Sequence, residues 1–280
     1  MPVKSALYVV ATPIGNLNDI SLRALEVLQS VDIIAAEHVQ NSKHLLSHHG
    51  ISTRLMTLHQ HNEAVIAHQI SKDLADGKSV ALISDAGTPA ISDPGAILVQ
   101  HIRKLGFPVI PIPGANAAVC AFSAAGFINP HFLFYGFLPS KSGLRQRVLK
   151  TLAGLPYTLV FYEAPHRIQE SLNDIMIVLG AQREITIARE LTKLFETIHQ
   201  CTLEKAVEWV KNDPNQQKGE FVLLVSGATP AEKTDISEQA LNTLRLLLTE
   251  LPLKQAVKLT AEISGENKKA LYQRALSMKP

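Results

Sequence analysis

Three short segments of the chain combine glycine, proline and small polar residues in a way that suits close contact with a ligand. They are residues 12–16 (Thr-Pro-Ile-Gly-Asn), 84–89 (Ser-Asp-Ala-Gly-Thr-Pro) and 113–117 (Pro-Gly-Ala-Asn-Ala), and each follows a short apolar run. Small residues let backbone N–H and C=O groups reach a ligand directly. A helix beginning after each segment would add N–H donors suited to a carboxylate or a phosphate.

The middle segment continues through residues 90–95, so that two Asp, two Pro and two Gly fall within eleven residues. A specialised loop of this length usually carries a function. None of the three segments matches G-x-G-x-x-G or G-x-x-x-x-G-K-[ST], so the spacing does not indicate a dinucleotide or nucleoside-triphosphate site. Gly and Pro also punctuate ordinary strand-to-helix connections, and any one segment alone has that structural explanation.

Short apolar runs alternate with helical patterns before and between these segments. Strands are expected at residues 7–11, 33–36, 55–58, 80–83 and 109–112. Helices are expected where apolar residues recur at helical spacing, namely at Leu22, Leu25 and Leu28, at Ile66, Ile70 and Leu74 after a capping Asn62, and over residues 117–125. The alternation predicts an α/β domain with a largely parallel sheet, in which strands 80–83 and 109–112 are buried on both faces.

A second α/β or α+β sheet is predicted further along the chain. Its expected strands are 132–135, 158–162, 185–188, 194–198 and 221–225, and its expected helices are 142–153, 167–179 and 203–212. Residues 229–233 are typical of a linker, and short helices follow them. We therefore predict an N-terminal α/β domain over 1–117, a C-terminal α/β domain over 118–229, and a linker with a helical basic tail over 230–280.

The bulk composition excludes several classes of protein. With 280 residues, 46% hydrophobic and 19% charged, the chain is typical of a globular protein of two modest domains. We expect neither a signal peptide nor a membrane span, because no apolar run approaches roughly 18–20 residues. Cys120 and Cys201 lack the spacing of a zinc site or a disulfide framework, so a reducing cytoplasm is the expected location.

Basic residues are concentrated in two places, although the formal net charge is only +2. Residues 141–150 contain four basic and no acidic side chains, and residues 251–280 contain six basic and two acidic ones. The remaining residues are therefore net acidic. This asymmetry permits a polyanionic partner, while solvated helix faces are the alternative explanation for either segment.

Motifs along nearly the whole chain resemble one family. Besides the three segments, they include Phe-Tyr-Glu-Ala-Pro-His-Arg at 161–167, Ala-Arg-Glu-Leu-Thr-Lys at 188–193 and Lys-Gly-Glu at 218–220. In the same order and with comparable spacing they resemble the tetrapyrrole-methylase fold and, within it, the ribosomal RNA cytidine 2'-O-methyltransferases. The resemblance implies two α/β domains with a cofactor cleft between them, a short C-terminal helical tail and a homodimer.

The same resemblance implies a function and a cofactor. The function would be 2'-O-methylation of a cytidine ribose in small-subunit (16S) ribosomal RNA, with S-adenosylmethionine as methyl donor. The positions carried over to cofactor binding are Pro13, Ser84, Asp85, Ala86, Gly87, Thr88, Ile91, Ala115, Asn116, Tyr162, Arg189, Glu190 and Leu191.

Methyl transfer to a ribose hydroxyl benefits from a base that removes the proton. The candidates are Glu63, Glu163 and Glu190. Each has a structural alternative: the start of a helix for Glu63, an ion pair with the nearby Arg167 for Glu163, and an ion pair with Lys193 for Glu190.

The residues expected to contact RNA are basic or lie in the family motifs. They are Lys141, Arg145, Arg147, His166, Arg167, Lys193, Lys268 and Lys269. One segment departs from the family pattern, because residues 36–40 read Ala-Glu-His-Val-Gln where the family usually has Ala-Glu-Asp-Thr-Arg. Losing the Arg donor fork would weaken any contact of this segment with a phosphate.

Two other functions are compatible with the sequence, and two histidines have the spacing of possible metal ligands. A tetrapyrrole or other small-molecule methylase of the same fold would need no basic tail, and a non-catalytic RNA-binding assembly protein would bind the cofactor without turnover. His44 and His48 are four residues apart on an expected helix, but no third ligand accompanies them, so no metal site is predicted.

Overall fold

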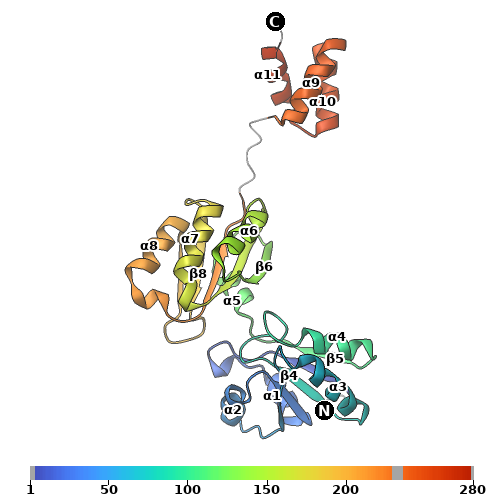
Figure 1. Cartoon of the computed structure of the whole chain (residues 1–280), viewed down its shortest axis with the longest axis vertical. Coiled ribbons are helices and arrows are strands. Elements are labelled where there is room, and N and C mark those ends of the chain that lie inside the picture. The colour runs from blue at the N-terminus through green and yellow to red at the C-terminus, as the bar shows by residue number, and fades with distance from the viewer. Residues whose placement is uncertain (1–3, 229–235, 279–280) are drawn as a thin grey trace. The chain divides into compact units, whose positions relative to one another are not determined.

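The computed structural model describes residues 4–228 and 236–278 of the chain. Its contacts divide the chain into two units, Met1–Gly227 and Ala228–Pro280, which are described separately (Figure 1). The first unit contains two five-stranded sheets, and the second contains three helices.

The first sheet is parallel throughout. Its strands are β1 (Leu7–Val10), β2 (Ile33–Ala36), β3 (Leu55–Thr57), β4 (Val80–Ile83) and β5 (Val109–Ile112), in the order β3-β2-β4-β1-β5. Strands β2 and β4 consist of apolar residues and are buried on both faces, as expected where helices cover both sides of a parallel sheet.

Helices pack on both faces of this sheet (Figure 1). One apolar core joins it to α1 (Leu22–Ser30) and α2 (Val39–His48), and another joins it to α3 (Glu63–Ala75) and α4 (Ala96–Lys104). A 3-10 helix, η1 (Leu17–Asp19), follows β1. The neighbouring strands β1 and β4 are followed by helices on opposite faces of the sheet, α1 in one core and α4 in the other. The carboxyl ends of these two strands therefore form a topological switch point, the usual place for a ligand in an open α/β sheet.

The second sheet has mixed strand directions. Its strands are β6 (Phe132–Phe137), β7 (Thr158–Glu163), β8 (Glu184–Arg189), β9 (Thr197–Thr202) and β10 (Phe221–Val225), in the order β6-β7-β10-β8-β9. Only β6 and β7 are parallel, and the other neighbours are antiparallel.

Helices also cover the second sheet. The helices α6 (Ser142–Leu152), α7 (Ile168–Leu179) and α8 (Leu203–Asn212) pack into one apolar core with it, and α5 (Ala117–Ala124) packs into another. Two 3-10 helices, η2 (Pro165–Arg167) and η3 (Pro214–Gln217), complete the unit.

The second unit consists of α9 (Glu238–Glu250), α10 (Leu253–Ser264) and α11 (Lys268–Met278). The side chain of Ser237 caps α9 by accepting a hydrogen bond from the Ala240 N–H. Gly265 ends α10 in the left-handed conformation (φ 70°), which glycine adopts without steric cost. Apolar residues of all three helices, including Leu244, Val257 and Leu271, form its core.

The predicted α/β class is confirmed, and most strands and helices lie within one or two residues of their expected positions. The predicted division of the first 229 residues at residue 117 stays a prediction. The predicted linker, residues 229–233, lies outside the described residues.

Three local predictions were wrong. The strand expected at 194–198 is β9, which begins at Thr197 because residues 190–196 form a turn. Strand β5 lies at the sheet edge, so it is only partly buried. Asn62 precedes α3, but its side chain accepts a hydrogen bond from the His59 N–H and donates one to the Thr57 carbonyl instead of capping the helix.

Within residues 4–228 and 236–278, no helix is both long enough and apolar enough to cross a membrane.

Candidate functional site

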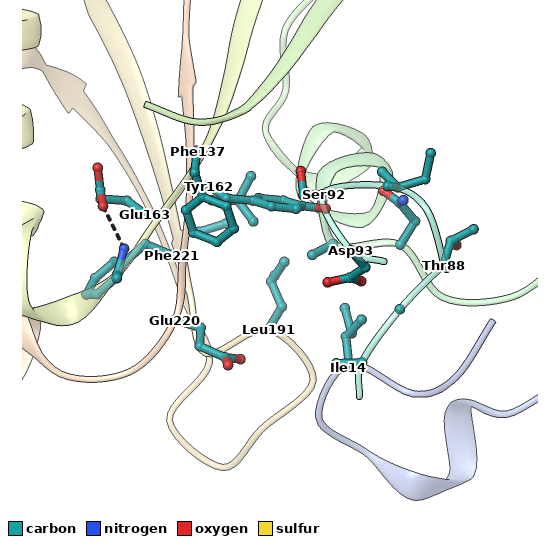
Figure 2. A pocket seen from close by; sticks show the side chains of 18 of the residues that line it. Ile14, Thr88, Ser92, Asp93, Phe137, Tyr162, Glu163, Leu191, Glu220 and Phe221 are labelled. Atoms are coloured by element: carbon teal, nitrogen blue, oxygen red, sulfur yellow. Dashed lines mark hydrogen bonds between the residues drawn. The ribbon is translucent and has the colours of Figure 1, made fainter. Parts of the chain in front are cut away.

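A cavity of about 320 Å³ lies in the first unit between the carboxyl ends of the parallel strands and the second sheet. Figure 2 shows how loops from the first sheet meet side chains of β6, β7 and β10 around it. Its lining is largely apolar and aromatic, with a few acids and hydroxyls. The lining residues are Ile14, Ala86, Gly87, Thr88, Ile91, Ser92, Asp93, Asn116, Ala117, Phe137, Tyr162, Glu163, Ala164, Pro165, Ala188, Leu191, Glu220, Phe221 and Val222.

Hydrogen bonds join the three predicted ligand loops into one wall. Thr12 and Gly87 exchange backbone hydrogen bonds of 2.8 and 3.0 Å, and the buried Thr12 hydroxyl donates to the Ser84 carbonyl. The Thr88 hydroxyl donates to the Ala115 carbonyl at 3.0 Å. The loops after β1, β4 and β5 therefore support one another.

Residues 191–193, in the turn after β8, contact the loop after β1. The Asn16 N–H donates to the Thr192 hydroxyl at 3.1 Å. A Cβ on Gly15 would lie 2.6 Å from the Lys193 Cγ and 2.8 Å from the Leu191 carbonyl oxygen, so only glycine fits there. This close approach brings Leu191 to the cavity.

Backbone strain is concentrated in the segments beside the cavity. Among the described non-glycine residues, positive φ angles occur at Ser5 and at four residues of these segments, Ala90 (68°), Ser92 (65°), Glu190 (51°) and Thr192 (64°). Such conformations cost on the order of 1–3 kcal/mol each and persist where the surroundings hold them, often at functional sites.

The residues predicted to bind the cofactor occupy two kinds of position. Seven of them line the cavity: Ala86, Gly87, Thr88, Ile91, Asn116, Tyr162 and Leu191. The others lie behind it or beside it: Pro13, Ser84, Asp85, Ala115, Arg189 and Glu190. Arg189 illustrates the second kind, because its guanidinium donates to the carbonyls of Lys218 and Phe195 and so braces the turn after β8.

The Glu63 carboxylate is buried behind the loop that follows β4. Its Oε1 accepts hydrogen bonds from the N–H groups of Gly95 (3.0 Å) and Leu98 (2.9 Å) at the start of α4. Glu63 does not line the cavity. Its carboxylate therefore fixes the end of the loop.

Glu163 lines the cavity but directs its carboxylate away from it. The carboxylate accepts from the Ala164 N–H at 2.8 Å and pairs with the Arg167 guanidinium. Figure 2 shows it pointing away from Asp93 and Leu191. The guanidinium of Arg167 also lies 5.8 Å from the centre of the Phe137 ring.

Glu190 forms an ion pair beside the cavity. Its carboxylate accepts from the Lys193 ammonium and from the Glu220 N–H, both at 2.9 Å. Burial alone would raise the pKa of Glu190, but these two hydrogen bonds and the nearby cations hold it below its ordinary value. All three predicted base candidates thus have hydrogen-bond donors of their own.

Asp93 is a cavity acid that was not among the predicted site residues. Burial, followed by repulsion from Glu37 and Asp85, raises its pKa to about 6, although a hydrogen bond from Ser84 opposes the shift. Burial and the charge of Asp93 also raise the pKa of Tyr162. The available sequence signal was its place in the long loop of residues 84–95.

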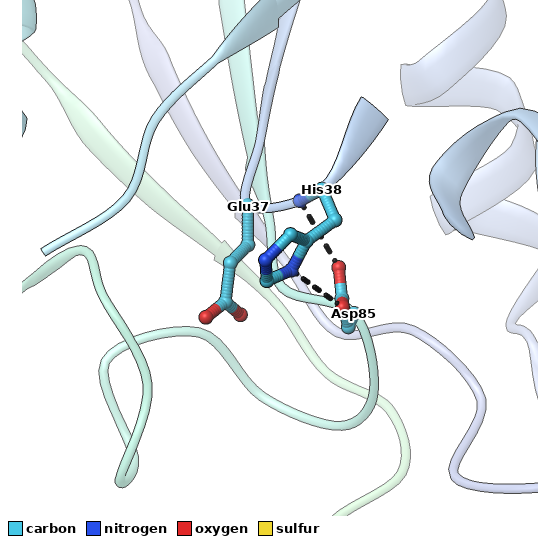
Figure 3. A group of neighbouring side chains, drawn as sticks. All are labelled: Glu37, His38 and Asp85. Carbon is cyan, nitrogen blue, oxygen red and sulfur yellow. Dashed lines mark hydrogen bonds and ion pairs between the residues drawn. The ribbon is translucent and has the colours of Figure 1, made fainter. Parts of the chain in front are cut away.

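The segment that departs from the family pattern lies at the end of β2, next to the loop after β4 (Figure 3). The His38 Nδ1 lies 2.8 Å from the Asp85 Oδ2, and the His38 N–H and the Asn41 amide also donate to Asp85. Burial and the Asp85 charge raise the pKa of Glu37. Ligand atoms of Glu37, His38 and Asp85 lie within 4.8 Å of one another, and the expectation of no bound metal stays a prediction.

The predicted RNA contacts are distributed over both units of the chain. Lys141, Arg147 and His166 are exposed in the first unit, and Lys268 and Lys269 are exposed on α11 of the second. Arg167 and Lys193 are engaged with acids, as described above.

The prediction for Arg145 was wrong. Its side chain is only 1% exposed, and its guanidinium bonds Asp174 at 2.6–2.7 Å and the carbonyls of Pro139 and Ser140. A side chain held inside the protein in this way cannot contact an RNA on its surface.

Comparisons with known proteins cover nearly the whole chain. Residues 6–207 match the family of tetrapyrrole (corrin/porphyrin) methylases, and residues 234–279 match a domain described as the RsmI C-terminal HTH domain. A solved structure of diphthine synthase is similar in fold, with a TM-score of 0.63, 16% identity and coverage of 80% of this chain and 90% of that one.

Curated relatives are far more similar in sequence. The Escherichia coli O157:H7 protein named ribosomal RNA small subunit methyltransferase I is 52% identical over 270 residues, 96% of this chain and 94% of its own. The Haemophilus influenzae Rd protein of the same name is 50% identical over 272 residues, 97% of this chain and 96% of its own.

Proposed function

The chain belongs to the tetrapyrrole (corrin/porphyrin) methylase family, and from this premise we propose that it methylates ribosomal RNA of the small ribosomal subunit. The observation that carries the proposal is the near-full-length identity of about 50% to relatives named for that activity. The match of residues 234–279 to the RsmI C-terminal HTH domain supports the proposal independently, because these residues do not overlap the methylase match at residues 6–207.

S-adenosylmethionine is the methyl donor of the family, and the cavity fits it. A volume of about 320 Å³ is within the roughly 300–1,000 Å³ of small-molecule sites. The aromatic and aliphatic side chains of the lining suit the adenine ring of the donor. Gly87 has a φ of 78° and no side chain, so the backbone groups around it are open to the donor's polar atoms. The carboxylate of Glu220 in the lining suits a positively charged donor.

Residues from both sheets would hold the donor. We assign this role to Ala86, Gly87, Thr88, Ile91, Asn116, Tyr162 and Leu191 at the cavity, with Pro13, Ser84, Asp85, Ala115, Arg189 and Glu190 supporting them. When bound, the donor supplies an electrophilic methyl group on a sulfonium sulfur. The protein's own contribution is to orient the two reactants, to exclude water and to accept the proton of the attacking hydroxyl.

The finer assignment is methylation of a cytidine ribose at its 2'-oxygen. The support is the order and spacing of the motifs at residues 12–16, 84–89, 161–167 and 188–193. We further propose that the protein acts as a homodimer in the cytoplasm, that its two sheets are separate domains meeting near residue 117, and that exposed lysines such as Lys268 and Lys269 contact the RNA.

Transfer of a labelled methyl group to small ribosomal subunits tests the proposal. Subunits lacking their own methylations are incubated with the full-length protein and labelled donor, and the modified nucleotide is then mapped. Label on a cytidine 2'-oxygen is the expected result. Label on a tetrapyrrole but on no RNA would contradict it, and so would cofactor binding without any transfer, the behaviour of a non-catalytic RNA-binding protein.

A further inference from the structure

We propose that Asp93 is the general base of the reaction, accepting the proton of the attacking ribose hydroxyl in the cavity. The inference rests on the proposed function and adds a catalytic residue to it. Figure 2 shows the Asp93 carboxylate directed into the space bounded by Ile14, Tyr162 and Leu191. It therefore lies where the loops of the first sheet face the second sheet.

The loop around Asp93 is built to hold this side chain in place. The Ala90 N–H donates to the Pro94 carbonyl at 3.2 Å, so the loop closes on itself around Asp93. At its end the Gly95 N–H donates to the buried Glu63 carboxylate. The strained φ angles of Ala90 and Ser92 lie within this closed turn.

A register shift in β6 of the second sheet makes room for the same loop. The register of β6 against β7 shifts between Phe134 and Gly136. A Cβ on Gly136 would lie 2.6 Å from the Ser92 hydroxyl oxygen, so the absence of a side chain makes room for Ser92. The second sheet thus helps to fix the residue next to Asp93.

Other acids near the cavity are less suited to accept a proton. Glu163 and Glu190 accept hydrogen bonds from cationic side chains, and Glu63 is away from the lining. Glu220 pairs with Lys193 and is largely exposed. Glu37 does not line the cavity. Within the described residues, Asp93 is the lining acid without a cationic partner among the recorded ion pairs.

The surroundings give this carboxylate the basicity that the step needs. Asp93 faces Glu37, which directly follows β2, Asp85 and Ser84 from its own loop, and Tyr162 from β7. A pKa of about 6 leaves it ionised at neutral pH and closer to the operating pH than an ordinary aspartate.

The step conserves atoms and charge. The ribose O–H bond breaks, its proton passes to the Asp93 carboxylate, and the oxygen forms a bond to the methyl carbon. The electron pair of the broken carbon–sulfur bond stays on the sulfur. A carboxylate and a sulfonium cation become a carboxylic acid and a neutral thioether, and the acid then returns its proton to solvent.

Replacing Asp93→Asn tests the role with little change in side-chain shape. Single-turnover methyl transfer to small subunits is measured from pH 5 to pH 8.5 at saturating donor, and donor affinity is measured by calorimetry. The wild-type rate should rise with pH through about 6 and then level off. Asp93→Asn should be slower by roughly 10²–10⁴-fold, without this rise and with donor affinity within about threefold of wild type.

Two matched variants complete the design. Asp76→Asn removes an equal charge from an exposed position at the end of α3 and should behave as wild type. Asp93→Glu keeps a carboxylate and should retain part of the rate together with its pH dependence. An Asp93→Asn rate within tenfold of wild type, or donor affinity reduced as much as the rate, would overturn the proposal.

Stability supplies a readout that is independent of turnover. Because the folded-state pKa of Asp93 is above its ordinary 3.8, the folded protein retains this proton between about pH 4 and pH 6 after the unfolded chain has lost it. Stability from this group is therefore lost as pH rises through that window. Asp93→Asn should raise the melting temperature by roughly 2–6 °C at pH 8, with a smaller difference at pH 4. An unchanged melting temperature at pH 8 would contradict the raised pKa of Asp93, and with it the buried, acidic surroundings that the proposal requires.

Failure of the proposed function is seen separately in the wild-type protein. If wild type transfers no label to RNA, that function is wrong and the assignment of Asp93 falls with it. If wild type transfers label and Asp93→Asn does so equally well, only the assignment of Asp93 is wrong.

Discussion

Glu63 shows how a buried acid can serve the site without entering the reaction. Its carboxylate accepts two N–H groups at the start of α4, at 2.9 and 3.0 Å. Asp93 lies only two residues before the first of these donors, Gly95. We therefore assign Glu63 to positioning the loop that carries the proposed base.

The substitution Glu63→Gln should destabilise the protein by about 1–3 kcal/mol, because a neutral amide accepts these N–H groups more weakly than a carboxylate. Urea denaturation measures this change. Glu26→Gln, at an exposed position of α1, is the control and should stay within about 0.5 kcal/mol of wild type. Unchanged stability together with a complete loss of methyl transfer would instead favour Glu63 as the base.

At the residue scale, the sequence predicted which segments form the site better than it predicted individual roles. The long loop of residues 84–95 stood out by composition, but its burial and acidic neighbours, which single out Asp93, arise only on folding. Arg145 failed for a related reason. A count of charges does not show which face of a helix a side chain occupies. Arg145, Leu149 and Leu152 all lie on the buried face of α6.

At the scale of elements, the critical contact joins the loop after β1 to the turn after β8. Gly15 lies so close to residues 191–193 that a Cβ would overlap their atoms at 2.6–2.8 Å. One of those contacts is a main-chain carbonyl, which cannot move aside as a flexible side chain can. Any side chain at residue 15 must therefore push the two elements apart.

The substitution Gly15→Ala should weaken donor binding roughly 5- to 150-fold, equivalent to about 1–3 kcal/mol of overpacking, because both elements border the cavity. Calorimetric titration with S-adenosylmethionine measures the affinity. Gly154→Ala is the control, since a Cβ there meets nothing within 4 Å, and its affinity should stay within about twofold. Equal affinities of the two variants would show that the contact at Gly15 is not needed for binding.

Strand periodicity located most elements because buried parallel strands are continuous apolar runs bounded by Gly and Pro. It failed at residues 194–198, where apolar residues turned out to be exposed. Leu194 is 88% and Phe195 66% exposed, since hydrogen bonds from the Arg189 guanidinium and to the Glu196 carboxylate hold a turn there. Apolar residues alone do not reveal such long-range polar contacts.

At the scale of the whole molecule, the chain combines a methylase unit with a separate helical unit. The second unit has its own apolar core of α9, α10 and α11 and its own family match. The charge distribution of the sequence permits an RNA-binding role for this unit, since six basic residues fall within residues 251–280 of a chain with a net charge of only +2. We expect the second unit to contribute RNA affinity and the first unit to bind the donor.

The double substitution Lys268→Ala and Lys269→Ala tests this division. Both lysines are exposed at the start of α11, so their loss should leave the core of the unit intact. If each lysine neutralises one phosphate, removing both should lower the affinity for small-subunit RNA. The negative slope of log affinity against log salt should become shallower by about two. Filter binding at several salt concentrations measures the slope, and calorimetry should give an unchanged donor affinity.

The matched control is Lys43→Ala with Lys72→Ala, which removes the same charge from exposed positions of α2 and α3 in the first unit. A general electrostatic attraction to the whole protein would reduce RNA affinity in both pairs to a similar degree. A local contact through α11 would reduce it only in the first pair. Equal effects would therefore refute a specific role for the second unit, even if methyl transfer itself were confirmed.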